Sequence, residues 1–180
     1  FPCHFSMNRL ATYHADLMMA LSQIDRPALE RLALALQGVK GTVYVLGNGG
    51  SQSNASHLVL HLIMSKIPAV DLASQIAMFT AFSNDYAFAA ASLHALRNMS
   101  KEGDALIVIS GSGDSPDILV ALAEARELNL KTFGLLGFGG GAAHWMCDHC
   151  LCLAMKGYGP IEDCHLVIIH MLQELLRHTV

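Results

Sequence analysis

The sequence has few charged residues. Asp, Glu, Lys and Arg make up 14% of the 180 residues, whereas hydrophobic residues make up 53%. An average soluble domain contains about 25% charged residues. This composition excludes a disordered or low-complexity chain. It also leaves apolar side chains to be covered at the surface, and we therefore expect an oligomer.

Basic runs, long apolar stretches and a signal peptide are missing as well. The 11 Lys and Arg are outnumbered by 15 Asp and Glu and are not clustered, which argues against direct binding to nucleic acid. No segment reaches about 18 apolar residues without a charge, so the sequence predicts no membrane span and no membrane partner. The chain begins without the basic and apolar segments of a signal peptide. We expect a cytoplasmic protein.

An even set of cysteines is also missing. The five Cys cannot all pair, and a chain of this length needs no disulfides to build a core, so we expect reduced thiols. Cys147, Cys150 and Cys152 resemble a metal-binding knuckle. However, Cys150 and Cys152 would lie on one side of a strand, and no second pair follows to complete a tetrahedral site. Core thiols are the preferred interpretation, with a metal site as the alternative.

Short apolar runs alternate with amphipathic segments along the chain. This alternation predicts parallel βαβ units and an α/β fold, a doubly wound three-layer sandwich. We expect one domain over residues 1–180, with a helical arm at 1–40 and an α/β core at 41–180. The expected strands are 42–46, 69–72, 104–109, 131–136 and 150–155. The expected helices are 10–24, 27–37, 52–64, segments up to 99, 116–128 and 161–177.

Two loops rich in Gly and Ser each follow a strand and precede a helix. They read GNGGS at 47–51 and SGSGDS at 110–115. Such loops bring backbone N–H groups, hydroxyls and the positive end of a helix dipole to an anion. Neither loop matches a P-loop or a dinucleotide fingerprint, so no nucleotide cofactor is expected. The pair predicts a phosphate monoester site; the alternative is two ordinary turns with helix caps.

Histidines form a second pattern. His57 and His61 are four residues apart on one predicted helix, and Glu162 and His170 are eight apart on the last helix, so each pair shares a face. Three imidazoles and a carboxylate suit zinc or another divalent ion, or an acid–base set. By spacing alone, ordinary histidines on amphipathic helices remain the alternative. His165 is a competing candidate.

These motifs, together with SNDY at 83–86 and IEDCH at 161–165, resemble the sugar isomerase (SIS) domain family, and within it the phosphoheptose isomerase branch. The resemblance covers residues 8 to 178. It implies a five-stranded parallel sheet and a homotetramer with active sites between subunits. It also implies conversion of sedoheptulose 7-phosphate to D-glycero-D-manno-heptose 7-phosphate through an enediol(ate), a step towards the heptose of lipopolysaccharide.

The resemblance also implies residue roles. Several relatives bind zinc through the first loop's helix and the last helix, which correspond here to a metal set of His57, His61, Glu162 and His170. The implied catalytic residues are His61, His170 and Glu162. The implied phosphate and sugar ligands are Asn48, Gly49, Ser51, Asn84, Asp85, Ser110, Ser112 and Ser115.

The sequence departs from the family pattern at the acid–base positions. His61 stands where the family carries its catalytic Glu, and Glu162 and Asp163 replace a Gln-Glu pair. Gly111 replaces a Thr of the second loop. Further replacements are Gly159 for an Asp and Ser65 for an Arg. Phosphate recognition is therefore expected to be kept, whereas the groups that move protons are changed.

Two functional hypotheses follow. In the first, the protein is an isomerase in which a neutral imidazole at His61 serves as base or metal ligand. In the second, it is a non-catalytic phosphosugar-binding or regulatory protein, of the kind that assists the bacterial replication initiator. An isomerase of another sugar phosphate lies between them. Polar groups kept at the changed positions favour the isomerase, because such groups are costly in a simple scaffold.

Overall fold

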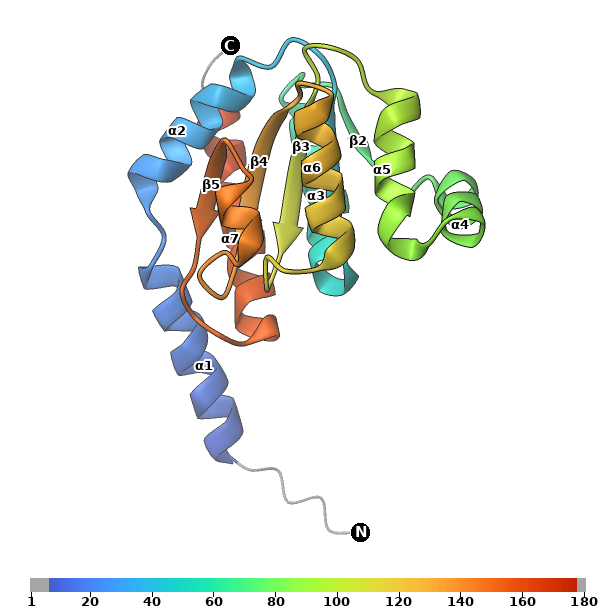
Figure 1. Ribbon diagram of the computed structural model, residues 1–180. Helices are drawn as coiled ribbons and strands as arrows, with labels where there is room; N and C mark the ends of the chain where they lie inside the picture. The colour runs from blue at the N-terminus through green and yellow to red at the C-terminus, as the bar shows by residue number, and fades with distance from the viewer. Residues whose placement is uncertain (1–6, 178–180) are drawn as a thin grey trace.

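The computed structural model describes residues 7–177 (Figure 1). Its five strands form one parallel sheet in the order β2-β1-β3-β4-β5, which confirms the predicted α/β class and the five-stranded sheet. The central strands are buried along their whole length, as parallel strands covered on both faces should be. The strands are β1 (Val43–Gly47), β2 (Ala69–Asp71), β3 (Ala105–Ser110), β4 (Lys131–Leu136) and β5 (His149–Cys152).

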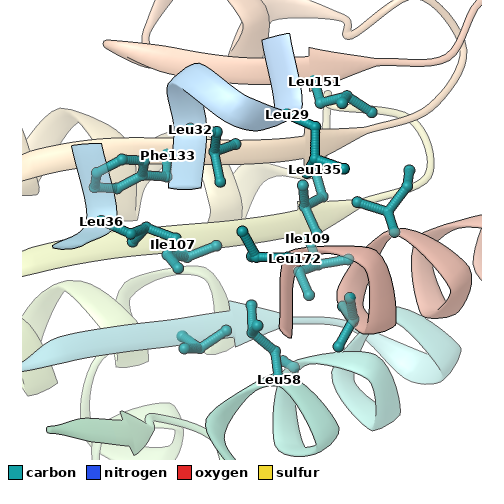
Figure 2. Packing of buried hydrophobic residues seen from close by; sticks show 14 of the residues in the cluster. Leu29, Leu32, Leu36, Leu58, Ile107, Ile109, Phe133, Leu135, Leu151 and Leu172 are labelled. Carbon is teal, nitrogen blue, oxygen red and sulfur yellow. The ribbon is translucent and has the colours of Figure 1, made fainter. Parts of the chain in front are cut away.

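Helices cover both faces of the sheet. The helices α2, α3 and α7 pack on one face, and α5 and α6 pack on the other (Figure 1). Figure 2 shows the hydrophobic core on the α2, α3 and α7 face, where Leu side chains of these helices pack against side chains of β3 and β4. The helical elements are α1 (Met7–Ser22), α2 (Arg26–Gln37), α3 (Gly49–Met64), α4 (Ile76–Asp85), α5 (Phe88–Met99), α6 (Pro116–Glu127), the short 3-10 helix η1 (Ala142–Trp145) and α7 (Tyr158–Arg177).

Some boundaries differ from the sequence prediction. The predicted helical segments before residue 99 are two helices, α4 and α5, which are separated at Tyr86 and Ala87 because Ala87 adopts an extended backbone with φ −176° and ψ 156°. The last strand ends at Cys152 and not at residue 155, because its partner β4 ends at Leu136, which is paired with Cys152. The helix of the first loop begins at Gly49, three residues earlier than predicted.

The two helices of the predicted arm differ in their packing. Helix α2 begins after Asp25, whose carboxylate accepts from the Ala28 N–H at 3.0 Å, and it buries leucines against the sheet. Helix α1 projects beyond the sheet (Figure 1) and contacts α7, where the Tyr13 hydroxyl donates to Asp163 at 2.5 Å. The division at residue 40 stays a prediction, and residues 1–6 and 178–180 lie outside the described chain. Among the described residues, no helix is long and apolar enough to cross a membrane.

Candidate functional site

The two Gly- and Ser-rich loops lie side by side. Strands β1 and β3 are neighbours in the sheet, with Gly47 opposite Ile109, so both loops leave the same edge at adjacent points. Together they form a small pocket, where Tyr158 and Glu162 from the start of α7 complete the wall. The other lining residues are Asn48, Ser51, Ile109, Ser110, Gly111, Ser112 and Ser115. The fold thus brings together five of the eight predicted phosphate and sugar ligands.

The hydroxyl groups of this pocket are available as donors. Ser110 Oγ accepts from the Gly113 N–H at 3.0 Å, and Ser112 Oγ accepts from the Asp114 N–H at 3.2 Å. Each hydroxyl therefore keeps its own hydrogen for a ligand. Ser115 occupies the N-cap position of α6, yet its side chain does not cap the helix. A set of O–H donors that line one pocket suits an anion.

Two helix N-termini add to the positive potential of the pocket. Helix α3 begins at Gly49 and α6 begins at Pro116, each directly after its loop. Gly49 has a φ of +55°, a left-handed conformation that glycine adopts without strain and that lets the loop turn sharply into α3. The first N–H groups of a helix lack partners within the helix, and they bind phosphate well. The pocket therefore has the chemistry of a phosphate site.

A residue that the sequence did not single out connects the two loops. Asp117, in the first turn of α6, is buried, and both of its carboxylate oxygens accept from Asn48 Nδ2, at 3.0 and 2.8 Å. Asn48 is thereby fixed between the loops. The sequence did contain a signal for Asp117: it is an acidic residue two positions after the second loop, and it follows Pro116 at the start of a predicted helix. The Asp117 carboxylate acts here as a positioning group.

The three predicted histidines meet at one point. His57 Nε2 lies 2.9 Å from His61 Nε2 and 3.0 Å from His170 Nε2, so imidazoles from α3 and α7 converge. The ring nitrogens form one of two groups among the described residues that could hold a metal ion. His61 is buried and His170 is exposed, so the group lies at the surface end of the contact between the two helices.

Gln173 and Arg177 orient His61 from behind. With the Gln173 amide oxygen turned to accept from Arg177 Nη2 at 2.8 Å, that oxygen lies 2.9 Å from His61 Nδ1 and accepts from it in the tautomer protonated there; the amide nitrogen lies 3.0 Å from the same atom. A proton on Nδ1 leaves Nε2 with a free lone pair, which is the form that binds a metal or takes up a proton. Burial lowers the pKa of His61, and the charges of His57, His170 and Arg177 lower it further. His61 is therefore neutral at pH 7, and the three imidazoles fit a divalent ion such as zinc.

Three predicted site residues lie elsewhere. Glu162 does not join the imidazoles, because eight residues along α7 place it about 12 Å from His170; it lines the phosphate pocket instead. Asn84 and Asp85 lie on the exposed end of α4, outside the pocket of this chain. The competing candidate His165 is fully buried, and burial lowers its pKa to about 4. His165 is therefore a neutral core residue.

Comparisons with known proteins show what the chain is similar to as a whole. The family model described as "SIS domain" matches residues 12–137. A phosphoheptose isomerase of Pelobacter propionicus is 35% identical over 142 residues, which cover 76% of this chain and 75% of that protein. The solved phosphoheptose isomerase from Francisella tularensis superposes with a TM-score of 0.88 at 30% identity, covering 95% of this chain and 97% of the other. The enzyme from Neisseria gonorrhoeae gives a TM-score of 0.84 at 26% identity, covering 94% and 96%.

Proposed function

The chain belongs to the phosphoheptose isomerase branch of the SIS domain family, and from this we propose that it interconverts sedoheptulose 7-phosphate and D-glycero-D-manno-heptose 7-phosphate. The observation that carries the proposal is the pocket between the two loops, with its free hydroxyl donors and two helix N-termini. It would hold the phosphate group through Ser51, Ser110, Ser112 and Ser115. The proposed product is a precursor of lipopolysaccharide heptose.

The distance between the pocket and the histidines supports a long sugar phosphate. Ser51 lies in the pocket, and His57 and His61 follow it by six and ten residues on the same helix, which is about 9 and 15 Å along the axis. An extended seven-carbon chain phosphorylated at one end can span the shorter of these separations, the one to His57, whose Nε2 lies 2.9 Å from His61 Nε2. In this proposal, C1 and C2 of the sugar lie at the imidazoles.

His61 is the proposed base for proton transfer between C1 and C2. It is neutral at pH 7 because burial lowers its pKa, and Gln173 leaves its Nε2 lone pair free. His170 faces it across the same point and would return the proton. His57, His61 and His170 would also be the residues that hold a zinc ion, which would supply Lewis-acid polarisation of the sugar oxygens. When His61 ligates such an ion, proton transfer falls to the remaining acid–base groups, and Glu162 is the carboxylate available.

Glu162 has to move for this role. Its carboxylate lines the phosphate pocket, where a phosphate dianion would repel it. We expect it to turn towards the sugar when substrate binds, where it can exchange a proton with C1 or C2. The start of α7 stays fixed meanwhile, because Asn54 Nδ2 donates to the Glu162 backbone carbonyl at 2.8 Å.

A homotetramer in the cytoplasm completes the proposal. Helix α4 has no buried residue in the single chain, and Ile76, Tyr86 and Phe88 around it are exposed. A neighbouring subunit would cover this face and receive Asn84 and Asp85 at its own site. The four cysteines of the described chain are free thiols, which suits a reducing compartment. Light scattering after size exclusion should give the mass of four chains; a stable monomer would contradict the shared site.

Proton NMR of sedoheptulose 7-phosphate with the purified protein in D₂O tests the activity. We expect the aldose phosphate to appear and deuterium to enter at C1 or C2. Shifted sugar resonances without turnover would instead support the binding-protein alternative. A panel of shorter ketose phosphates separates the seven-carbon substrate from the others, since they should turn over more slowly.

A further inference from the structure

A second group of metal-ligand side chains lies on the other face of the sheet. His144 in η1 and Cys150 and Cys152 in β5 form the remaining group among the described residues that could hold a metal ion. The two thiols pack against the core shared with α5 and α6, whereas the three histidines described above lie on α3 and α7. The imidazole–thiol group is therefore separate from the proposed catalytic site.

The three ligand atoms are close together. His144 Nδ1 lies 3.2 Å from Cys150 Sγ and 3.2 Å from Cys152 Sγ, and the two sulfur atoms are 3.7 Å apart. Two thiolates on one tetrahedral zinc, at about 2.3 Å each, lie about 3.8 Å apart, and a thiolate and an imidazole lie about 3.5 Å apart. The observed triangle is within a few tenths of an ångström of one face of such a tetrahedron.

The backbone around the group is shaped to bring these atoms together. Cys150 and Cys152 lie on one side of β5 because strand side chains alternate. Gly140 has a φ of +97°, and a Cβ there would lie 2.8 Å from His144 Cβ and 2.9 Å from Cys152 Sγ. Only glycine at this position lets the turn place the imidazole directly over the thiol. The His144 N–H donates to the Gly140 carbonyl at 3.1 Å, which closes the turn.

The exposure of the group differs from that of core thiols. Cys164 is the fully buried cysteine among the described residues. The sequence analysis preferred core thiols for Cys147, Cys150 and Cys152, which is wrong for all three, because each is half-buried, as is His144. A cation can therefore reach them from solvent. Cys147 does not belong to the group. Its sulfur atom lies instead against Gly134 of β4, where a Cβ would be 3.0 Å away.

We propose that His144, Cys150 and Cys152 form a binding site for a thiophilic cation, with Zn²⁺ as its ligand. Two thiolates and one imidazole form a donor set that binds zinc in preference to Mg²⁺ and Ca²⁺, which favour oxygen ligands. The turn that carries His144 also contacts the second loop, because the Ala143 N–H donates to the Gly113 carbonyl at 2.9 Å and the Ala142 N–H donates to Asp114 at 2.8 Å. The bound ion would fasten β5 to the loop that holds the phosphate.

Cobalt spectroscopy tests this site without using activity. The full chain is stripped of metal, kept reduced with a phosphine and titrated with Co²⁺. We expect a thiolate-to-cobalt charge-transfer band in the near ultraviolet, which the sulfur-free site of His57, His61 and His170 cannot give. Zinc added afterwards should displace the cobalt and remove the band. In parallel, the zinc content of the protein should fall by one equivalent per chain in the Cys150→Ser/Cys152→Ser variant.

Matched variants separate the ligands from their neighbours. Cys147→Ser keeps both proposed thiolates and should retain the band, whereas Cys150→Ser and Cys152→Ser should each lose most of it. The His57→Ala/His61→Ala variant should retain it fully. Circular dichroism of each variant confirms that the fold is intact. Absence of the band in the wild-type chain, or an equal dependence on Cys147, would overturn the assignment.

Discussion

The carboxylate of Glu162 occupies the space where a side chain at residue 50 would begin. A Cβ built on Gly50 would overlap both carboxylate oxygens, so the absence of a side chain in the first loop is what admits Glu162 to the phosphate pocket. This contact joins α7 to the loop before α3. It also places a negative group beside the donors that would hold a phosphate, which makes Glu162 the most informative residue to change.

The Glu162→Gln variant should separate phosphate repulsion from proton transfer. Removing the charge relieves repulsion, so KM for the sugar phosphate should fall. Turnover should fall by about a hundredfold, because a proton-transfer group is lost. The matched control is Glu102→Gln, an exposed carboxylate in the turn before β3 at the other edge of the sheet, and it should change neither constant. A variant with lower KM and unchanged kcat would contradict a catalytic role.

Replacement of His61 or His170 by Ala should reduce both turnover and bound metal. Each change removes one of three converging nitrogens, and we expect kcat to fall by about a hundredfold or more. Steady-state kinetics and elemental analysis of the same preparations measure the two effects. His14→Ala, an exposed histidine of α1, is the control. Unchanged turnover in both site variants would remove these residues from the proposed mechanism.

The Ser51→Ala variant tests phosphate binding. Ser51 is buried at the start of α3 and lines the pocket, and a hydrogen bond to a charged group contributes about 1.5–3 kcal/mol. We expect KM to rise at least about tenfold. Ser53→Ala, two residues along on the exposed side of the same helix, should leave KM unchanged. Equal effects of the two changes would indicate a general disturbance of α3.

Acid should destabilise the fold through His165. Burial lowers its pKa to about 4, below the ordinary value of about 6.5, so the unfolded chain binds a proton that the folded chain excludes. Stability from this group is complete above pH 6.5 and is lost as the pH falls towards 4. Between pH 7 and 5 the loss is about 2 kcal/mol.

Urea unfolding at these two pH values measures the effect. The His165→Leu variant should lose about 2 kcal/mol less stability than the wild type between pH 7 and 5, because it has no proton to take up. The exposed His14→Ala variant should follow the wild type. An identical pH dependence of His165→Leu and the wild type would show that His165 is not the group responsible.

Local patterns predicted the parts of the site that lie on one element. The loops at 47–51 and 110–115 were found because glycine and serine follow apolar strands, and His57 and His61 because four residues make about one helical turn. The register of β1 and β3 then brings the loops together. The alternation of strands and helices was sufficient for the fold class; the errors lay at element ends and at η1, a short 3-10 helix that was not predicted.

Residues that act across elements were harder to predict. Glu162 shares a helical face with His170, and that shared face is why the sequence analysis grouped it with the histidines. Two helical turns separate the two residues along the axis, which keeps the Glu162 carboxylate away from the imidazoles. His144 lies in an irregular turn that has no period, and its approach to Cys150 and Cys152 depends on the positive φ of Gly140. Asn84 and Asp85 lie on a helix that the single chain leaves uncovered.

The pairing of β1 with β3 also bears on how the protein is made. The first loop leaves the ribosome long before the second, since β2, α4 and α5 separate them in the chain. A growing chain that ends before Ser110 therefore has one half of the phosphate pocket and no neighbour for β1 on that side. Such long-range pairing is slow to form compared with helices. Sugar phosphate would stabilise only chains in which β1 has paired with β3. Its binding during translation would therefore report when these two central strands pair.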